Sequence, residues 1–406
     1  LYDGDGTTSS RMVIYSSSGN PVTAWTTVYY GKQQAPNIHI LNACSNITIE
    51  NIEFVHGSIG VKIAPNATNT IDNVLIHNCK FRHCFKGVAY YGVNGLLTNI
   101  SVVNNIFEDI GNVPINMGTD WGEGMYISHN RIVRCGGATS IGAIFGASFP
   151  HSSYPNARLY IEDNYVDTVY RNTYWNESFG YYLESRSINT TVRRNYVRNC
   201  VLSGLHTNSG EPGNEFLNNI IEDCGEGYND SDALTSPEPS HTANTVVSNN
   251  VFNRVRIGAV FFRSVSGDVY KLAMTNNIFR ATDAADSKGI AYDGEVNTAV
   301  GSGKAGWVED HNCVYGFVDL KVLNGTSTPT TEAFGANGIT TDPLIDDQSF
   351  PASTSPCIGA GTIVLDERDY DGKYRKGFSN DIGAKWFDAH EDSTVEVLLA
   401  SGGTVY

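Results

Sequence analysis

The most regular feature of the chain is a short pattern of polar and apolar positions that recurs between residues 99 and 318. Each copy starts with Asn, has an apolar residue two positions later, and has a small or apolar residue three positions after that. The Asn positions are Asn105, Asn130, Asn164, Asn195, Asn219, Asn250, Asn277 and Asn312, so successive copies lie 24 to 35 residues apart. A repeat of about 25 residues with insertions of variable length is typical of a solenoid.

Apolar and polar residues alternate with a period of two in the segments that surround each copy. Examples are residues 99–103, 159–161, 191–193 and 246–248. A period of two indicates strands rather than helices. One coil of strands cannot bury its own apolar side chains, so the coils must stack and share one core. The sequence therefore predicts an all-β fold, a parallel β-solenoid.

Stacking determines what each repeated position must be. An Asn at one corner of every coil suits the left-handed backbone conformation, which Asn tolerates better than other non-Gly residues. Its side chain can also hydrogen-bond from coil to coil along a buried ladder. A second predicted stack, three residues past the apolar position, contains Cys84, Ile110, Cys135, Val169, Cys200, Cys224, Val255, Thr282 and Phe317.

This second stack explains four of the eight cysteines as buried thiols. The chain contains no Cys-x-x-Cys motif and no paired spacing, so neither a metal site nor a disulfide framework is indicated. One bridge among Cys44, Cys79, Cys313 and Cys357 remains open.

An Asn ladder at the second turn of a three-strand coil resembles the right-handed parallel β-helix of the pectate lyase superfamily. The resemblance implies a single-stranded solenoid of three sheets, with about ten coils in residues 1–318. It also implies an irregular C-terminal tail, residues 319–406, that packs on the last coils. The subfamily is not identified, because the motifs of polygalacturonases and the calcium signature of pectate lyases are absent.

Composition limits the partners. The net charge is −16 with 17% charged residues, which argues against nucleic acid and anionic membrane surfaces. It also disfavours polyanionic glycans, unless Ca²⁺ or a local Arg/Lys cluster intervenes. No apolar run is long enough for a membrane helix, so membrane insertion is not expected. No cofactor is predicted, although Ca²⁺ stays open.

In the superfamily, the first strand of each coil and its flanking loops form the catalytic groove. Here that strand follows a Gly or another small residue, and alternation predicts that its second and fourth positions face outward. The second positions are Lys62, Ala89, Asn116, Ile144, Tyr182, His206, Asn229, Val260 and Ala291. The fourth positions are Ala64, Tyr91, Gly118, Gly146, Glu184, Asn208, Ser231, Phe262 and Asp293. Polar, titratable residues concentrate in three successive coils.

Carboxyl groups in these coils suit acid/base hydrolysis. The backbones of Glu184 and Asp232 should lie roughly 9–10 Å apart, two strand spacings. Inverting glycosidases hold their two carboxyls about 6.5–9.5 Å apart, which leaves room for water. Asp230 is a third candidate. It faces inward by strict alternation, unless the strand ends there and turns it to the groove.

The second positions suit a different reaction. Tyr182 and His206 should lie on adjacent coils, about 5 Å apart. With a nearby Arg, such a pair has the groups that β-elimination of a uronic acid needs. Candidate catalytic residues are therefore Glu184, Asp230, Asp232 and His206. Candidate substrate-binding residues are Tyr182, Arg186, Asn208, Asn229, Arg263, Trp175 and Trp121, of which the two Trp side chains could also be loop anchors.

Together these features predict a secreted carbohydrate-active enzyme that cleaves a polysaccharide or oligosaccharide, by hydrolysis in preference to elimination. The acidic net charge weighs against elimination of a uronate. The alternative is a glycan-binding β-helix with little or no activity, such as a surface adhesin or a phage tailspike body. The chain begins at Leu1 without Met, which predicts a removed N-terminal piece. A homotrimer or part of a larger chain would fit, at an extracellular, cell-surface or virion-surface location.

Overall fold

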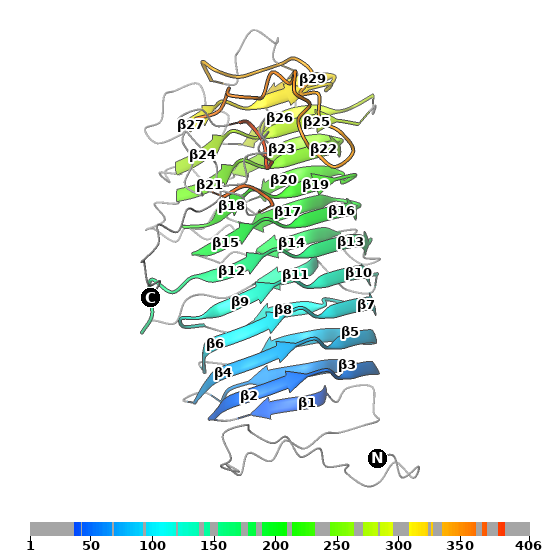
Figure 1. Cartoon of the computed structure of the whole chain (residues 1–406), viewed down its shortest axis with the longest axis vertical. Helices are drawn as coiled ribbons and strands as arrows, with labels where there is room; N and C mark the ends of the chain where they lie inside the picture. The colour runs from blue at the N-terminus through cyan, green and yellow to red at the C-terminus, as the bar shows by residue number, and fades with distance from the viewer. Residues whose placement is uncertain are drawn as a thin grey trace, which may run out of the picture.

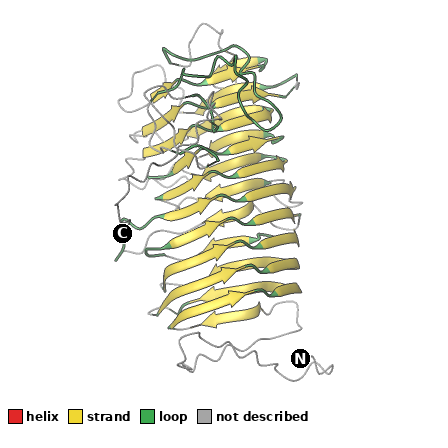
Figure 2. Ribbon diagram, in the orientation of Figure 1, coloured by secondary structure: helices red, strands yellow, loops and turns green. Residues whose placement is uncertain are grey.

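The structure is a computed structural model (Figure 1). It describes residues 36–41, 43–66, 69–91, 95–118, 121–137, 142–146, 153–171, 178–183, 189–208, 213–231, 244–263, 271–282, 285–294, 308–323, 326–327, 335–362, 368–371 and 381–385. Throughout these ranges the chain forms strands, turns and loops, without a helix (Figure 2). Accordingly, none of the described segments is a helix that could span a membrane.

The strands wind into stacked coils with three faces. Face A consists of β2 (Cys44–Glu50), β4 (Thr70–His77), β6 (Leu96–Val103), β9 (Met125–Ser128), β12 (Leu159–Glu162), β15 (Thr190–Arg193), β18 (Glu215–Leu217), β21 (Asn244–Ser248), β24 (Lys271–Thr275) and β27 (Val308–Asp310). These ten strands form one parallel sheet. Its ten rungs agree with the predicted coil number.

Face B and face C belong to a second, 20-stranded sheet, because β3 (Glu53–Ala64) and β5 (Lys80–Tyr91) run through both faces. Face B continues with β7 (Ile106–Ile110), β10 (Arg131–Gly136), β13 (Tyr165–Tyr170), β16 (Tyr196–Cys200), β19 (Ile220–Glu222), β22 (Val251–Val255), β25 (Ile278–Ala281) and β28 (Cys313–Tyr315).

Face C starts with β1 (Pro36–Leu41) and the second halves of β3 and β5. It continues with β8 (Ile115–Gly118), β11 (Gly142–Gly146), β14 (Phe179–Leu183), β17 (Ser203–Asn208), β20 (Glu226–Ser231), β23 (Ile257–Arg263), β26 (Lys288–Gly294) and β29 (Asp319–Leu323). These strands pair in parallel from coil to coil, and only β30 (Thr326–Ser327) is antiparallel, against β29.

The predicted Asn ladder is confirmed. From Asn105 to Asn312, each Asn side-chain amide donates to Oδ1 of the next Asn at 3.0–3.1 Å, and its backbone N–H donates to the same oxygen at 2.9–3.0 Å. Its backbone conformation was predicted wrongly. The left-handed residue is the one before each ladder Asn, with φ of 53° to 57° at Asn104, His129, Asp163, Arg194, Asn218, Asn249, Asn276 and His311.

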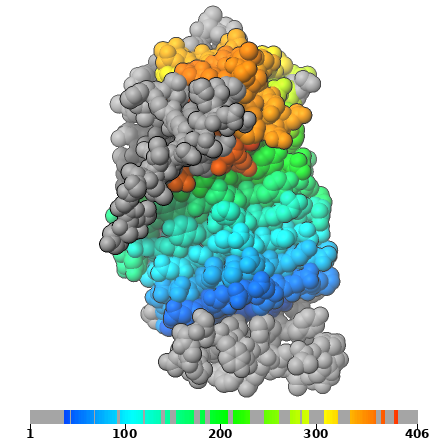
Figure 3. Space-filling view, viewed as in Figure 1, coloured from blue at the N-terminus to red at the C-terminus, as the bar shows by residue number. Residues whose placement is uncertain are grey.

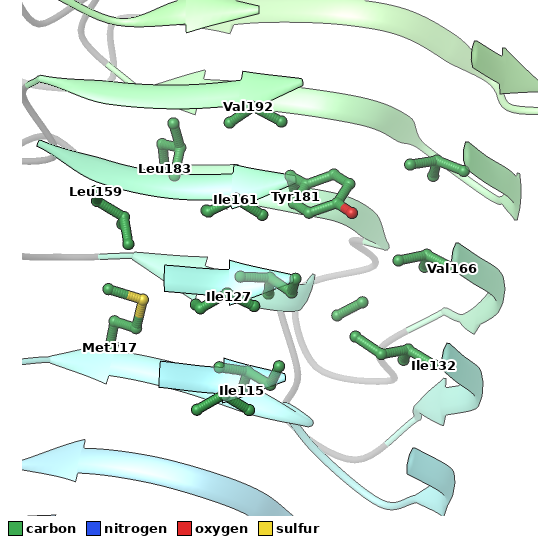
Figure 4. Packing of buried hydrophobic residues seen from close by; sticks show 14 of the residues in the cluster. Ile115, Met117, Ile127, Ile132, Leu159, Ile161, Val166, Tyr181, Leu183 and Val192 are labelled. Carbon is green, nitrogen blue, oxygen red and sulfur yellow. The ribbon is translucent and has the colours of Figure 1, made fainter. Parts of the chain in front are cut away.

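The core fills the space between the three faces. Inward side chains stack from coil to coil, as Ile127, Ile161 and Val192 of face A illustrate (Figure 4). The predicted cysteine stack is buried, and all eight cysteines are free thiols, so the bridge left open is not formed. Burial of this apolar surface supplies the main stabilisation of the stacked coils.

Polar residues interrupt the core at its C-terminal end. Lys321 is in register with the core residue Ile290, and Glu309 is in register with Met274. Lys321 Nζ lies 3.6 Å from Glu309 Oε2, and both side chains are largely buried. The last coil therefore closes the apolar core with an ion pair.

The described parts of the C-terminal segment are residues 335–362, 368–371 and 381–385. Ile339 pairs in parallel with Cys313 at the C-terminal edge of face B, and the later residues lie on the outside of that face (Figure 3, orange to red). Ile345, Cys357, Ile382 and Ala384 pack against the outward side chains of Ile220, Val251, Ile278 and Cys313. Glu222, which is 1% exposed, accepts a hydrogen bond from Ser349 Oγ at 2.9 Å. This segment thus covers an apolar strip that would otherwise face water.

Candidate functional site on face C

An outward row of side chains runs across face C in strict register. It comprises His39, Lys62, Ala89, Asn116, Phe145, Tyr182, His206, Asn229, Val260 and Ala291. The sequence placed Ile144 in this row, which is wrong. Gly142 pairs with Phe179 rather than with Gly180, so β11 is shifted by one residue and Ile144 points into the core.

Tyr182 and His206 form the centre of this row, on the adjacent strands β14 and β17. Their rings stack with centroids 4.8 Å apart and an interplanar angle of 9°. Phe145 extends the stack on the other side of Tyr182, at 5.4 Å. The Phe179 ring packs on both rings, with its centroid 5.1 Å from that of Tyr182 and 4.2 Å from that of His206. The predicted proximity of Tyr182 and His206 is confirmed.

A polar network adjoins these rings on β17 and β20. Asn229 Nδ2 donates to Glu226 Oε2 at 2.6 Å, and the Ser203 hydroxyl donates to the same carboxylate oxygen. Sequence reasoning missed Glu226 and Ser203. They occupy the position directly before the leading Gly of each strand, where Phe179, Ser203 and Glu226 align. The polar residues directly before the leading Gly of β17 and β20 were the sequence signal that could have identified them.

Burial sets the electrostatics of the site. Tyr182, His206 and Asn229 are 8%, 5% and 9% exposed, so this central part of the row is covered rather than open. Burial lowers the pKa of His206 to about 3, because a charged imidazolium would lose its hydration. His206 is therefore a neutral ring at neutral pH, able to accept or donate a hydrogen bond.

Two of the remaining candidates lie in the interior. Asp230 shares a row with Leu183 and Thr207 and is 1% exposed, so its carboxyl is not part of the outward row. The strand continues through Ser231, which prevents the outward turn considered for Asp230. Trp121 is fully buried beside Leu97, so it cannot be a surface platform for sugars; it is a core residue and anchors its loop.

The other candidates have no described side chain. Asn208 lies in β17 and Arg263 in β23, where the backbone is described. Glu184, Asp232, Arg186 and Trp175 lie outside the described residues. The carboxyl pair Glu184 and Asp232 therefore stays a prediction. Within the described ranges, no group of three or more His, Cys, Asp or Glu side chains is arranged to hold a metal ion. The expectation for Ca²⁺ is untested.

Comparison with known proteins supports the architecture. Residues 72–236 match the family model described as the right-handed beta helix region. The match covers less than half of the chain and agrees with the parallel β-helix that the strands form. The fold predicted from the Asn ladder is thereby confirmed.

Two solved structures are similar to this β-helix protein. A PL6 family alginate lyase, AlyGC, has 11% sequence identity and a TM-score of 0.34, with 78% of this chain and 52% of that chain covered. An arginine-to-alanine variant of AlyGC has 11% identity and a TM-score of 0.35, with 86% and 56% covered. The β-helix protein thus spans about half the length of each lyase chain. No curated protein matches its sequence.

Proposed function

We propose that this β-helix protein is a carbohydrate-active enzyme that cleaves a polysaccharide on face C. The observation that carries the proposal is the Tyr182–His206 stack beside the Glu226 network, on three adjacent strands. Aromatic rings next to oriented polar groups are typical of ligand sites, in which a few polar groups fix the orientation of the ligand. The rigid coils hold these groups in place before substrate binds.

The described side chains favour elimination over hydrolysis. Inverting hydrolysis requires two carboxyl groups on the same surface. In this network Glu226 is the one described carboxylate, since Asp230 points inward. Elimination requires one proton acceptor and one proton donor. Glu226 would accept the proton from the sugar carbon, Tyr182 would give its phenolic proton to the leaving glycosidic oxygen, and a new carbon–carbon double bond would form.

His206 would act as a positioning residue in this scheme. Its ring holds the plane of Tyr182 from one side while Phe145 holds it from the other. Because the imidazole is neutral, it places no positive charge beside the phenol. In the proposed scheme the Tyr182 phenol supplies the proton that the leaving oxygen takes up.

The test is a screen of purified protein against acidic and neutral polysaccharides with two detectors. Ultraviolet absorbance of unsaturated sugar ends reports elimination, and new reducing ends without that absorbance report hydrolysis. Tyr182→Phe and Glu226→Gln should each lower kcat by roughly 10²–10⁴-fold, the range for lost acid–base catalysis. Tyr126→Phe is the matched control, because Tyr126 lies on face A and is 40% exposed. Full activity in both site variants would refute these assignments.

A second candidate is glycan binding without cleavage. The low exposure of Tyr182 and His206 favours it, because a reacting sugar must reach the groups that act on it. A wild-type protein that binds a glycan in affinity electrophoresis, but releases no product of either kind, would establish this second function.

A further inference from the structure

A second polar cluster lies on face C, toward the N-terminal coils. Lys86 Nζ donates to the Tyr91 hydroxyl at 2.5 Å and lies 5.2 Å from the centre of the Tyr91 ring. Lys62 Nζ, from the neighbouring strand β3, lies 5.5 Å from the same centre. Two ammonium groups from different coils therefore converge on one tyrosine.

The register of the strands explains this convergence. Lys62 and Ala89 are partners on β3 and β5, and both belong to the outward row that contains Tyr182. Lys86 precedes Ala89 by three residues and Tyr91 follows it by two. Because the Ala89 side chain is a single methyl group, the Lys86 stem can lie along the strand and reach Tyr91. Tyr91, Lys62 and Lys86 are all partly exposed, so solutes have access to them.

No described carboxylate neutralises these two lysines. Lys80, Lys321 and Lys385 each have an acidic partner, namely Glu108, Glu309 and Asp371. Lys62 and Lys86 have no such ion pair with any acidic side chain that the structure describes. In a chain with a net charge of −16, two neighbouring cations without acids are a local exception. Their mutual repulsion would be relieved by a bound anion.

His39 completes the edge of the cluster, in register with Lys62. Its Nε2 is buried and has no hydrogen-bond partner among the described residues. Burial, and secondarily the charge of Lys62, lowers the pKa of His39 to about 4, so the imidazole is neutral at neutral pH. An anion held by the lysines would therefore lie near a neutral ring rather than near a third cation.

We propose that Lys62, Lys86 and Tyr91 form a binding site for the acidic group of a glycan, either a carboxylate or a sulfate ester. The site rests on the proposed function, since it names the class of polysaccharide that face C would accept. Three coil steps separate Ala89 from Tyr182 along the row, about 14–15 Å at the usual strand spacing. A chain lying along the solenoid axis could contact both places at once.

The test measures binding of the full chain to oligosaccharides of equal length that are carboxylated, sulfated or neutral, by titration calorimetry at low and high salt. Replacing Lys62→Met and Lys86→Met together removes both charges and keeps most of the apolar stems. This double variant should bind the preferred acidic oligosaccharide at least tenfold more weakly, and the neutral one unchanged. Lys80→Met, which breaks an ion pair on face B, is the matched control and should have no effect.

The two acidic ligands separate a carboxylate site from a sulfate site. Undiminished acidic binding in the double variant, equal loss in Lys80→Met, or no binding of either acidic ligand by the wild type would overturn the proposal. A folded double variant is verified by an unchanged thermal midpoint. Lysine-dependent binding without cleavage would leave this site standing and remove the proposed catalysis. Cleavage without lysine dependence would do the reverse.

Discussion

Replacing Asn195 by Ala should expose how strongly the Asn ladder holds the coils together. Asn195 is fully buried, and its Oδ1 accepts from both the backbone N–H and the side-chain amide of Asn164 at 3.0 Å. Its own amide donates to the carbonyls of Ile161 and Arg193 and to Oδ1 of Asn219. Alanine would leave two buried donors of Asn164 without their acceptor, at roughly 1–3 kcal/mol each. We expect a loss of about 3–5 kcal/mol.

The measurement is urea unfolding followed by far-ultraviolet circular dichroism, with the m-value checked because stacked repeats can unfold in parts.

A second comparison tests the backbone geometry at the corner of the coil. Asn195 does not have a positive φ, so Asn195→Gly should be less stable than Asn195→Ala by about 0.5–1 kcal/mol. His129, which is exposed with a φ of 56°, should show the opposite order, with Gly more stable than Ala by about 1 kcal/mol. Equal stability of Asn195→Ala and the wild type would refute the reasoning.

Three further predictions concern burial, close packing and the C-terminal segment. Burial lowers the pKa of His206 from 6.5 to about 3, so the unfolded chain binds an extra proton below pH 6.5. The free energy of unfolding therefore falls as the pH drops toward 3, by about 2–3 kcal/mol at pH 4.5. His206→Gln should flatten the pH dependence of the urea midpoint. Gly227→Ala would place Cβ 2.5 Å from the carbonyl oxygen of the next coil and should lower the thermal midpoint strongly, whereas Gly111→Ala, whose nearest atom is 3.8 Å away, should not. Glu222→Ala removes the carboxylate that binds Ser349, so hydrogen exchange in residues 335–362 should accelerate while the coils stay protected; uniform acceleration would contradict this.

The architecture could be predicted because its determinants repeat. A single Asn at a corner proves little, but eight in one column require that the coils be stacked in register. The backbone detail was missed by one position. The residue before each ladder Asn varies between Asn, His, Asp and Arg, so its left-handed conformation leaves no single-residue signal, as His129 and Arg194 illustrate.

The candidate site was predicted less completely, because outward positions carry no repeated constraint. Counting from the leading Gly worked for Tyr182 and His206 but failed at Ile144, where Gly142 pairs one residue earlier than expected. Alternation correctly indicated an inward Asp230, although a buried carboxyl in a core row is unusual. The position of Glu226 before the Gly could have been read from the sequence, but its contact with Asn229 required the three-dimensional structure.

A stack of parallel coils has no fixed length, because each coil offers an apolar surface and open backbone groups on which another coil can pair. Such an open edge invites chains to join end to end into fibres. The Lys321–Glu309 pair makes that joining costly at the C-terminal edge, because a newcomer's apolar residues would have to strip water from two charges. Replacing both residues by leucine would leave an apolar C-terminal edge on which a second chain could pair.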